Sequence, residues 1–594
     1  MIRFILAFLL TLSGVHAQVP PDRRIEWKPG VRDGIPTRTN LINVKNAPYQ
    51  AKGDGQSDDK AAIQKAIDAA TAEQVVYLPR GTYKVSGGLT LNGKSISIRG
   101  DGPDATLIRY DGSSGIDIIK CTRGSDYGNP IDITAGLEKG STKLTLTSAS
   151  SVNVGDIIWV SQENDPDFVI NGGDNGFCSW CGRNDGNRVM TQMDKVLAKT
   201  SNTVTLERPL YLTFKTSLHP QLRTCATVTR VGIESLKVAR TNISAGADGS
   251  NLVLSLCDNS WITNCASQNP GRRHIFLEMC YACEVGQCDL RSDPDWWHNY
   301  SDHNYGIFMF SLNSDHLIND NIVFRCRHGL IFEGGGSGCV VAYNYSVGNV
   351  SEPDKDWLSG DLDTHGPHPF MNLFEGNVTS KLAHDNTFGS ASHNTSFRNH
   401  VVNWSVSNTT PTSGRWAMDI QQHSYYNNLV GNVIGQPGDT GERFAKTGIS
   451  GRTLASYRFG FECPGCGTVT DPKVEQTTLV SGNYDYIGKG VIWDETSGHV
   501  LPSSLYLTTR PSFWPASLPW PAFGPDLNPM VGVIPAELRY NGQAPPVPTP
   551  TPAPTATPEP PRPTPTPRPP VQTFEKWIEN LNNWIRANPP TPDQ

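Results

Sequence analysis

Residues 51–70 read AKGDGQSDDKAAIQKAIDAA, and this segment predicts a helix at roughly 58–71. Ser57 suits the N-cap position, and Asp58 and Asp59 fall in the first turn, where the helix dipole favours negative charge. The apolar residues recur at the spacing of one helix face, at Ile63, Ala66, Ile67 and Ala70. The segment therefore predicts a short amphipathic helix.

Strand patterns follow the predicted helix directly. VVYL at 75–78 and TYKV at 82–85 read as strands around the turn Pro79-Arg80-Gly81, and ISIRG at 96–100 alternates in the same way. Together with AKGDGQSDD, these segments resemble the N-terminal cap and first coils of the pectate lyase superfamily, over about residues 42–110. The branch is the one that includes polygalacturonases, pectate-lyase-3-type segments and phage tailspikes. The resemblance implies an all-β fold, a right-handed parallel β-helix whose open end is covered by the helix.

A repeat in the middle of the chain supports a solenoid independently of the resemblance. Short strand-like segments end at Asn321, Asn344, Asn377, Asn399 and Asn432, whose positions differ in turn by 23, 33, 22 and 33. A coil of about 22 or 23 residues, lengthened by about ten in alternate coils, explains these spacings. Asn264 and Gln287 extend the register by a further coil of the shorter kind. We expect the asparagine side chains to stack along the axis and to hydrogen-bond from coil to coil.

The composition indicates an exported protein without affinity for nucleic acid. The net charge is −7 over 594 residues, and no Lys/Arg-rich block appears. Residues 1–17 read as a signal peptide, with Arg3 before a short apolar run and small residues at the cleavage site. No later segment reaches the roughly 20 apolar residues of a membrane span. We therefore expect a secreted protein, in the extracellular space or the periplasm.

The 13 cysteines include three close pairs, Cys178/Cys181, Cys280/Cys283 and Cys463/Cys466. Two such pairs form a zinc site in some proteins, but those pairs lie close together in sequence, and these lie about a hundred residues or more apart. The spacing favours buried thiols and local disulfides over zinc. Cys265 and Cys288 are separated by one short coil of the predicted register, and we expect them to stack inside the solenoid.

The composition also divides the chain. The β-helix domain is predicted at 18–543, with a Pro- and Trp-rich segment at 501–543 wrapped on the last coils. Residues 544–570 are a Pro/Thr-rich linker that favours polyproline II. Residues 571–594 form a short amphipathic helical tail. We expect this tail to dock either on a partner protein or on the β-helix.

The extra residues of alternate coils predict a wall of loops at 289–305, 349–369 and 404–425, beside a groove for a chain-like substrate. These loops combine carboxylates, histidines and tryptophans, and aromatic rings stack on sugar faces. Solvated loop residues are the alternative interpretation. The predicted polysaccharide-binding residues are Trp296, Trp297, Trp357, Trp416, Asp295, Asp302, His368 and His423.

The asparagine register also predicts catalytic carboxylates. Asp363 and Asp385 precede their ladder asparagines, Asn377 and Asn399, by the same number of positions, so the two are expected at matching places on adjacent coils. Asp419 is one position closer to the next ladder asparagine. Like charges at the strand spacing of ~4.8 Å raise one pKa, which keeps a general acid protonated.

His365, His393 and Glu333 are expected as neighbours of these carboxylates. The match assumes that the extra residues of the longer coil lie upstream of Asp363. If the insertion lies elsewhere, Asp385 pairs with His365 or Asp361 instead.

The function that these features favour is polysaccharide degradation by a glycoside hydrolase. Residues 251–450 hold few lysines and many Asp and His, which favours two-carboxylate hydrolysis over a lyase acting on a uronate glycan. A non-catalytic glycan-binding or adhesin-type β-helix is the other alternative. No cofactor is required, although the Asp-x-Asp pairs leave a calcium ion open.

The resemblance supplies no catalytic set. Polygalacturonases carry Asn-Thr-Asp, Asp-Asp, Gly-His-Gly and Arg-Ile-Lys segments, and only Thr364-His365-Gly366 approaches one of these. The Arg-x-Pro-x-x-Arg pattern of pectate lyases is also missing.

Overall fold

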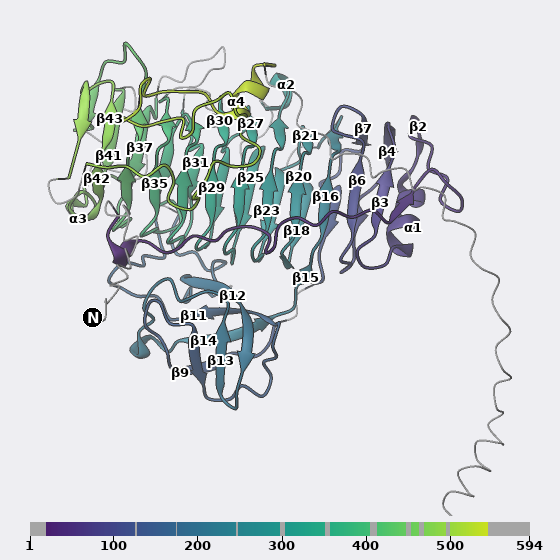
Figure 1. The fold of residues 1–594 in the computed structure, drawn as a ribbon, viewed down its shortest axis with the longest axis horizontal. Helices are drawn as coiled ribbons and strands as arrows, with labels where there is room; N and C mark the ends of the chain where they lie inside the picture. The colour runs from purple at the N-terminus through teal and green to yellow at the C-terminus, as the bar shows by residue number, and fades with distance from the viewer. Residues whose placement is uncertain are drawn as a thin grey trace, which may run out of the picture. The chain divides into compact units, whose positions relative to one another are not determined.

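Short parallel strands, stacked coil upon coil, form the main body of the protein (Figure 1). This computed structural model describes residues 19–543 except 125–126, 174, 184, 245–246, 298–302, 351–356, 404–412, 447–452, 463–468 and 495–498, and it leaves the side chains of Asp295 and Trp297 undescribed. The signal peptide, linker and tail predicted at 1–17, 544–570 and 571–594 lie outside these residues, as do Asp302, Cys463 and Cys466. In the described part of the chain no helix is long and apolar enough to cross a bilayer.

Three long sheets follow one another around each coil. The first contains β1 (Leu41–Asn43), β3 (Val75–Leu78), β6 (Ser97–Gly100), β16 (Gly232–Glu234), β20 (Trp261–Thr263), β23 (Glu284–Gly286), β26 (Leu317–Asn319), β29 (Val340–Ala342), β32 (Leu373–Glu375), β35 (Thr395–Phe397), β38 (Asn428–Val430) and β42 (Leu479–Ser481).

The second sheet contains β2 (Asp54–Asp58), β4 (Gly81–Val85), β7 (Thr106–Tyr110), β17 (Lys237–Arg240), β21 (Ala266–Gln268), β24 (Asp289–Arg291), β27 (Ile322–Phe324), β30 (Tyr345–Val347), β33 (Val378–Thr379), β36 (His400–Val401), β39 (Val433–Ile434), β43 (Asn483–Asp485) and β44 (Gly490–Ile492). Its neighbours pair in parallel up to β43, which pairs with β44 in the antiparallel sense.

The third sheet carries the candidate site. It contains β5 (Leu89–Thr90), β8 (Ile119–Cys121), β18 (Ser250–Ser255), β22 (Arg273–Glu278), β25 (Tyr305–Phe310), β28 (Leu330–Glu333), β31 (Leu362–Thr364), β34 (Leu382–His384), β37 (Trp416–Ile420), β41 (Ala455–Phe459) and β40 (Glu442–Phe444). The predicted parallel β-helix is therefore confirmed.

The predicted asparagine ladder is present inside the coils. Asn321, Asn344, Asn377, Asn399 and Asn432 are fully buried, and each amide nitrogen donates to the side-chain oxygen of the next asparagine at 2.9–3.0 Å. The predicted extension through Asn264 and Gln287 is wrong by one residue, since both have positive φ angles, as does Asp320 just before the ladder. Cys265 and Cys288 fill the ladder positions, and the Asn321 oxygen accepts the Cys288 N–H at 2.9 Å.

The cysteines follow the favoured interpretation. Cys265, Cys280, Cys283 and Cys288 are buried free thiols in the apolar interior. Cys178 and Cys181 form a disulfide, so the pairs Cys178/Cys181 and Cys280/Cys283 do not form a zinc site.

The cap helix is present with a different start. Helix α1 (Lys60–Ala69) buries Ile63, Ala66 and Ile67, as expected for the cover of the first coil. Ser57 lies in β2 and is not its N-cap. The Asp59 carboxylate precedes the helix but accepts the N–H groups of Lys52 and Gly53 at 2.6 and 2.9 Å, so it orders the incoming loop.

A closed antiparallel barrel interrupts the coils, and the sequence analysis did not predict it. It contains β9 (Ile131–Ala135), β10 (Lys143–Leu146), β11 (Ile157–Ser161), β12 (Thr191–Lys199), β13 (Thr203–Leu206) and β14 (Gln221–Cys225). The chain returns to the coils through β15 (Val228–Thr229), which pairs with β19 (Cys257–Asp258). The barrel lies beside the stacked coils (Figure 1). It contacts them through hydrogen bonds such as Met193 N–H to Ser314 Oγ, 2.9 Å.

Residues 501–543 pack against the outside of the coils, as Figure 1 shows in yellow-green. Phe523 and Trp514 join the apolar cluster of Tyr343 and Phe397. Arg398 makes a bidentate pair with Asp526 at 2.8–2.9 Å. The remaining helices are short: α2 (Pro294–Trp297), α3 (Pro472–Thr477), α4 (Pro535–Tyr540) and two 3₁₀ turns, Pro21–Arg23 and Thr216–Leu218.

We predict that Asn377→Leu destabilises the β-helix by ~3 kcal/mol or more. Its amide donates to the carbonyl of Val341 and to Asn399, and its oxygen accepts the Asn344 N–H, so the leucine leaves several buried groups unpaired at ~1–3 kcal/mol each. Denaturant midpoints measure the effect. The matched control is Asn202→Leu at an exposed site, which should leave the midpoint unchanged. Equal midpoints for both variants would contradict a structural role for the ladder.

Candidate active site

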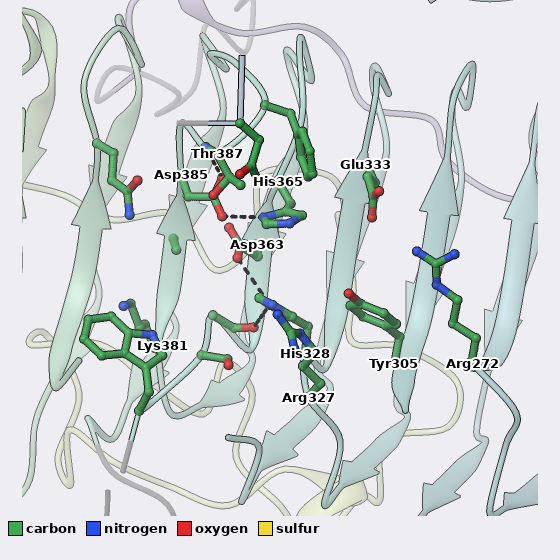
Figure 2. A pocket seen from close by; sticks show the side chains of 17 residues that line it. Arg272, Tyr305, Arg327, His328, Glu333, Asp363, His365, Lys381, Asp385 and Thr387 are labelled. Atoms are coloured by element: carbon green, nitrogen blue, oxygen red, sulfur yellow. Dashed lines mark hydrogen bonds and ion pairs between the residues drawn. The ribbon is translucent and has the colours of Figure 1, made fainter. Parts of the chain in front are cut away.

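A cavity of about 420 Å³ opens over the outer face of the third sheet, and Figure 2 shows its side chains. Its lining comes from β25, β28, β31 and β34, from the loops around them and from one residue of the barrel domain. The lining residues are Asn175, Arg272, Tyr305, Arg327, His328, Glu333, Trp357, Ser359, Gly360, Asp363, His365, Lys381, Ala383, Asp385, Thr387, Phe388 and Gln421. We call it the reaction cavity.

The strand register aligns the central groups of the cavity in rows that run from strand to strand. Ile331, Asp363, Ala383 and Asp419 lie opposite one another on successive strands, so Asp363 faces Ala383 and not Asp385. The predicted match of Asp363 with Asp385 is therefore wrong by two residues.

The mismatch arises in one turn of the coil. The insertion does lie upstream of Asp363, as the prediction assumed. However, Leu382 lies two residues farther from Asn399 than its strand partner Leu362 lies from Asn377. The turn after β34 is thus two residues longer than the turn after β31.

The longer turn produces the pairing that the sequence left as the alternative. His365 Nδ1 and Asp385 Oδ2 lie 2.5 Å apart, and Asp385 Oδ1 accepts the Thr387 N–H at 3.0 Å (Figure 2). Asp363 remains close, since one ligand atom each of Asp363, His365 and Asp385 lies within 4.8 Å of the others. The two aspartates are neighbours after all, with the imidazole beside them.

Burial and neighbouring charge set opposite protonation states on two histidines. Burial alone would lower the pKa of His365, but Asp385, Glu333 and Asp363 outweigh it and raise the pKa to about 9. Burial and the nearby His365 hold the pKa of His328 well below its usual range. The two rings lie 5.4 Å apart. At neutral pH the site therefore holds an imidazolium beside a neutral imidazole.

The tautomer of His328 follows from its partner. Its Nδ1 lies 2.9 Å from the carbonyl oxygen of Gly360, which can only accept a hydrogen bond. The single ring proton therefore resides on Nδ1, and Nε2 carries a lone pair. Tyr305 stacks against this ring at 5.7 Å and 13°.

Two carboxyl groups of the cavity, Asp363 and Glu333, have pKa values shifted towards their neutral forms. Burial and the charge of Asp385 raise the pKa of Asp363 well above its usual value, and burial raises the pKa of Glu333. Asp419 behaves differently, because Arg458 and Lys381, at 2.8 and 3.2 Å, outweigh burial and lower its pKa. Asp419 is a partner of cations and not a free acid.

Three of the predicted aromatic residues are described. Trp357 lines the cavity and meets Trp416 edge-on at 5.5 Å, with Lys381 over both rings. Trp296 is not among the lining residues, and its indole donates to the carbonyl of Pro270 at 2.9 Å.

Other predicted residues lie away from the cavity. His368 is buried between Ser390 and Ser392, and His393 stacks on Tyr426 at 5.0 Å. Burial lowers the pKa of both to about 3. His423 lies near Asp471, outside the cavity lining. The side chains of Asp295 and Trp297 are not described.

The sequence analysis missed His328, Lys381, Arg272, Arg327 and Tyr305. Each lies at or next to the start of a strand of the third sheet, beside residues that were predicted. His328 is opposite Gly360 in the strand register, three positions from Asp363, so a correct register would have found it.

Among the described residues, one group has ligand atoms close enough together to hold a metal ion: Asp363, His365 and Asp385. Calcium takes six to eight oxygen ligands, whereas this group offers two carboxylates, one shifted to its neutral form, and an imidazole that burial and charge keep protonated. The donor set does not suit calcium, and no step below is assigned to a metal. Binding of a calcium ion by the Asp-x-Asp pairs of the sequence remains a prediction.

Comparison with known proteins agrees with this fold. The family described as "Rhamnogalacturonase A/epimerase, pectate lyase-like" matches residues 41–161. The chain is a parallel β-helix protein whose residues 41–161 resemble this family. The resemblance drawn from the cap segment is thereby confirmed.

Curated relatives match short segments only. Mannuronan C5-epimerase AlgE2 of Azotobacter vinelandii is 44% identical over 95 residues, 14% of this chain and 9% of the relative. Alginate lyase 7 of the same organism is 58% identical over 48 residues, 8% of this chain and 5% of the relative. A "Probable glucan endo-1,3-beta-glucosidase" of Arthroderma benhamiae is 43% identical over 61 residues, 10% and 7%. The chain thus matches less than a tenth of the length of each of these carbohydrate-active relatives.

Solved structures resemble the chain at low identity and with TM-scores below 0.5. The tailspike protein gp49 from Pseudomonas phage LKA1 has a TM-score of 0.47 and 15% identity, covering 67% of this chain and 64% of that one. The A-module of Azotobacter vinelandii mannuronan C-5 epimerase AlgE4 has a TM-score of 0.36 and 14% identity, covering 75% and 100%. Function has to be argued from the site.

We predict that His365 titrates near pH 9 in the folded protein and that Asp385→Asn moves this pKa below that of free histidine. A pKa raised above the unfolded value of ~6.5 stabilises the fold fully below that pH, and the contribution is lost as pH rises through about 9. NMR titration of the imidazole measures the pKa. Thermal melts of wild type and Asp385→Asn should converge between pH 6.5 and 9, by at most ~1.4 kcal/mol per pH unit. Parallel melts across this range would contradict the ion pair.

Proposed function

We propose that this protein acts on an acidic polysaccharide and removes the proton α to the carboxylate of a uronate residue, the first step of β-elimination or of C5 epimerisation. The observation that carries the proposal is the neutral His328 beside the protonated His365 in a cavity with excess positive charge. This is a base next to an acid, the pair that proton transfer at carbon requires.

The charge balance of the lining favours an anionic substrate. Arg272, Arg327, Lys381 and His365 are cations, and Asp385 and Glu333 are the anions that remain if Asp363 is neutral. A uronate carboxylate placed among these cations is stabilised, and so is the enediolate that forms when its α proton leaves. A neutral glycan would gain nothing from them.

His328 is the proposed base. Its unprotonated Nε2 is the atom that can accept the proton, because Nδ1 is held by Gly360. The positive charge of His365 and Arg327 contributes to its low pKa, and an anionic substrate offsets that charge. Substrate binding therefore shifts the pKa of His328 towards the range in which a general base works best.

A proton donor completes either outcome. The His365 imidazolium carries a proton at neutral pH, and burial and the charge of Asp385 shift the pKa of the Asp363 carboxyl towards its protonated form. Protonation of the leaving glycosidic oxygen gives an unsaturated product, and return of a proton to carbon from the opposite face gives the epimer. The relatives include a mannuronan C5-epimerase and an alginate lyase, which supports the shared first step.

Hydrolysis is the second candidate, and the raised pKa of Asp363 next to Asp385 is what favours it. It needs a second carboxylate that is free to attack the sugar or to activate water. Both oxygens of Asp385 are already engaged, by His365 and by the Thr387 N–H, and burial raises the pKa of Glu333, the other carboxyl of the lining, towards its neutral form. We therefore favour proton abstraction over the hydrolysis that the composition of the chain favoured.

We predict that wild-type protein incubated with oligouronates in D₂O gives either an ultraviolet-absorbing unsaturated product or deuterium at C5. His328→Gln should lower kcat roughly 10²–10⁴-fold, because it removes the base while keeping the Gly360 contact within reach. His423→Gln, outside the cavity, is the matched control and should retain full activity. New reducing ends without unsaturation or deuterium would identify a hydrolase and refute the proposal.

A further inference from the structure

A second cavity, of about 340 Å³, adjoins the reaction cavity and belongs to no predicted site. It shares Arg272, Glu333 and Phe388 with the reaction cavity, so the two are continuous. Its lining is otherwise aromatic and cationic: Trp180, Arg273, Phe308 and Phe310. We call it the aromatic cavity.

The floor of the aromatic cavity continues the two rows of the reaction cavity along the third sheet. Phe276, Phe308, Ile331 and Asp363 occupy one row, and Glu278, Phe310 and Glu333 occupy the other. Phe308 is two strands from Asp363, about 10 Å at the usual strand spacing. A glycan chain lying along the rows would therefore place neighbouring sugar residues over both cavities.

The barrel domain supplies the opposite wall. Trp180 stacks on Phe310 with ring centroids 5.6 Å apart and meets Phe388 edge-on at 5.2 Å. Phe388 in turn meets the His365 ring at 5.2 Å. An unbroken series of ring contacts thus joins the aromatic cavity to the proposed acid. The Cys178–Cys181 disulfide holds the short loop that carries Trp180.

Two arginines, Arg272 and Arg273, give this cavity positive charge, and Glu333 in the same lining offsets part of it. The guanidinium of Arg273 lies over Phe276 at 4.4 Å and over Phe308 at 4.9 Å. Arg272 and Arg273 share one carboxylate, Asp248, at 3.4 and 3.0 Å, and the Asp248 side chain is 59% exposed. The Nε atoms of both arginines are buried without a hydrogen-bond partner among the described residues.

We propose that the aromatic cavity is a binding subsite for a second uronate residue of the same chain, next to the one that reacts. Rings of the Trp180 and Phe310 type stack on the apolar face of a sugar. Arg272 and Arg273 bind its carboxylate, since guanidinium groups match carboxylates in geometry and charge. The barrel domain is then a specificity element that selects for consecutive acidic residues. This proposal rests on the proposed function, because it assumes an acidic glycan.

The test measures binding of defined probes by calorimetry, independently of turnover, in the His328→Gln background. The probes are hexamers of mannuronate, guluronate and galacturonate, with neutral mannohexaose as the uncharged control. Trp180→Ala and Arg273→Gln should each weaken binding of the acidic hexamer roughly tenfold or more. Phe177→Ala is the matched control on the same loop, since its side chain is 58% exposed and is not part of the cavity lining.

The outcomes separate the two proposals. Equal hexamer affinities for Trp180→Ala, Arg273→Gln and Phe177→Ala overturn the subsite and leave the proposed function intact. Weakened binding in the first two variants, with no proton exchange or elimination by the wild type, supports the subsite and overturns the proposed function. If mannohexaose binds as well as the acidic hexamers, or no hexamer binds, the subsite for an acidic residue is refuted. A circular dichroism spectrum for each variant confirms that it is folded.

Discussion

The asparagine ladder is the interaction on which the rest of the structure depends. Each buried amide donates to a backbone carbonyl of its neighbouring coil and to the next asparagine, while its oxygen accepts a backbone N–H. These contacts satisfy polar groups at the fully buried bend between the first and second sheets. They also fix one residue of each coil above one residue of the next. The rows on the third sheet follow from that alignment together with the lengths of the turns between the sheets, such as the longer turn after β34.

The outward-facing rows of the third sheet explain why the site has an aromatic part and an ionisable part. Outward positions carry phenylalanines on β22 and β25, and acids and histidines at and just after β31 and β34. The interior of the coils is filled mainly by aliphatic side chains and thiols, with a few aromatic rings such as Phe332 and Phe374. The outward-facing aromatic and ionisable groups of the third sheet lie in line, where a linear polymer can contact both. The chemistry of the site therefore depends on which residues occupy the two outward-facing rows of the third sheet.

The parts of this arrangement that a sequence can predict are the ones that repeat. Asn321 to Asn432 recur at nearly fixed spacing, so the coil and its ladder could be predicted, and so could the neighbourhood of Asp363, His365 and Asp385. The spacing does not show how a longer coil distributes its extra residues among three turns. For this reason the pairing of Asp363 with Asp385 was two residues off. His328 was missed because nothing near it repeats, and its role depends on a carbonyl oxygen of another coil.

Two features that the sequence analysis did not predict, the longer turn after β34 and the barrel, are physically connected. The turn that follows β34, with its two extra residues, is the one on which the barrel loop packs: Asn175 N–H donates to the Thr387 carbonyl at 3.1 Å, and Ile170 N–H donates to Ser390 Oγ at 2.8 Å. A side chain at Gly173 would collide with the carbonyl oxygen of Asn386, so the approach requires glycine there. The same turn carries Asp385 to its place opposite His365 and holds it through the Thr387 N–H. The barrel thus supports the segment that sets the protonation of His365, besides placing Trp180 over the neighbouring cavity. The barrel is an insertion between coils of the β-helix. In this chain it forms part of the wall of the site and contributes to its electrostatics.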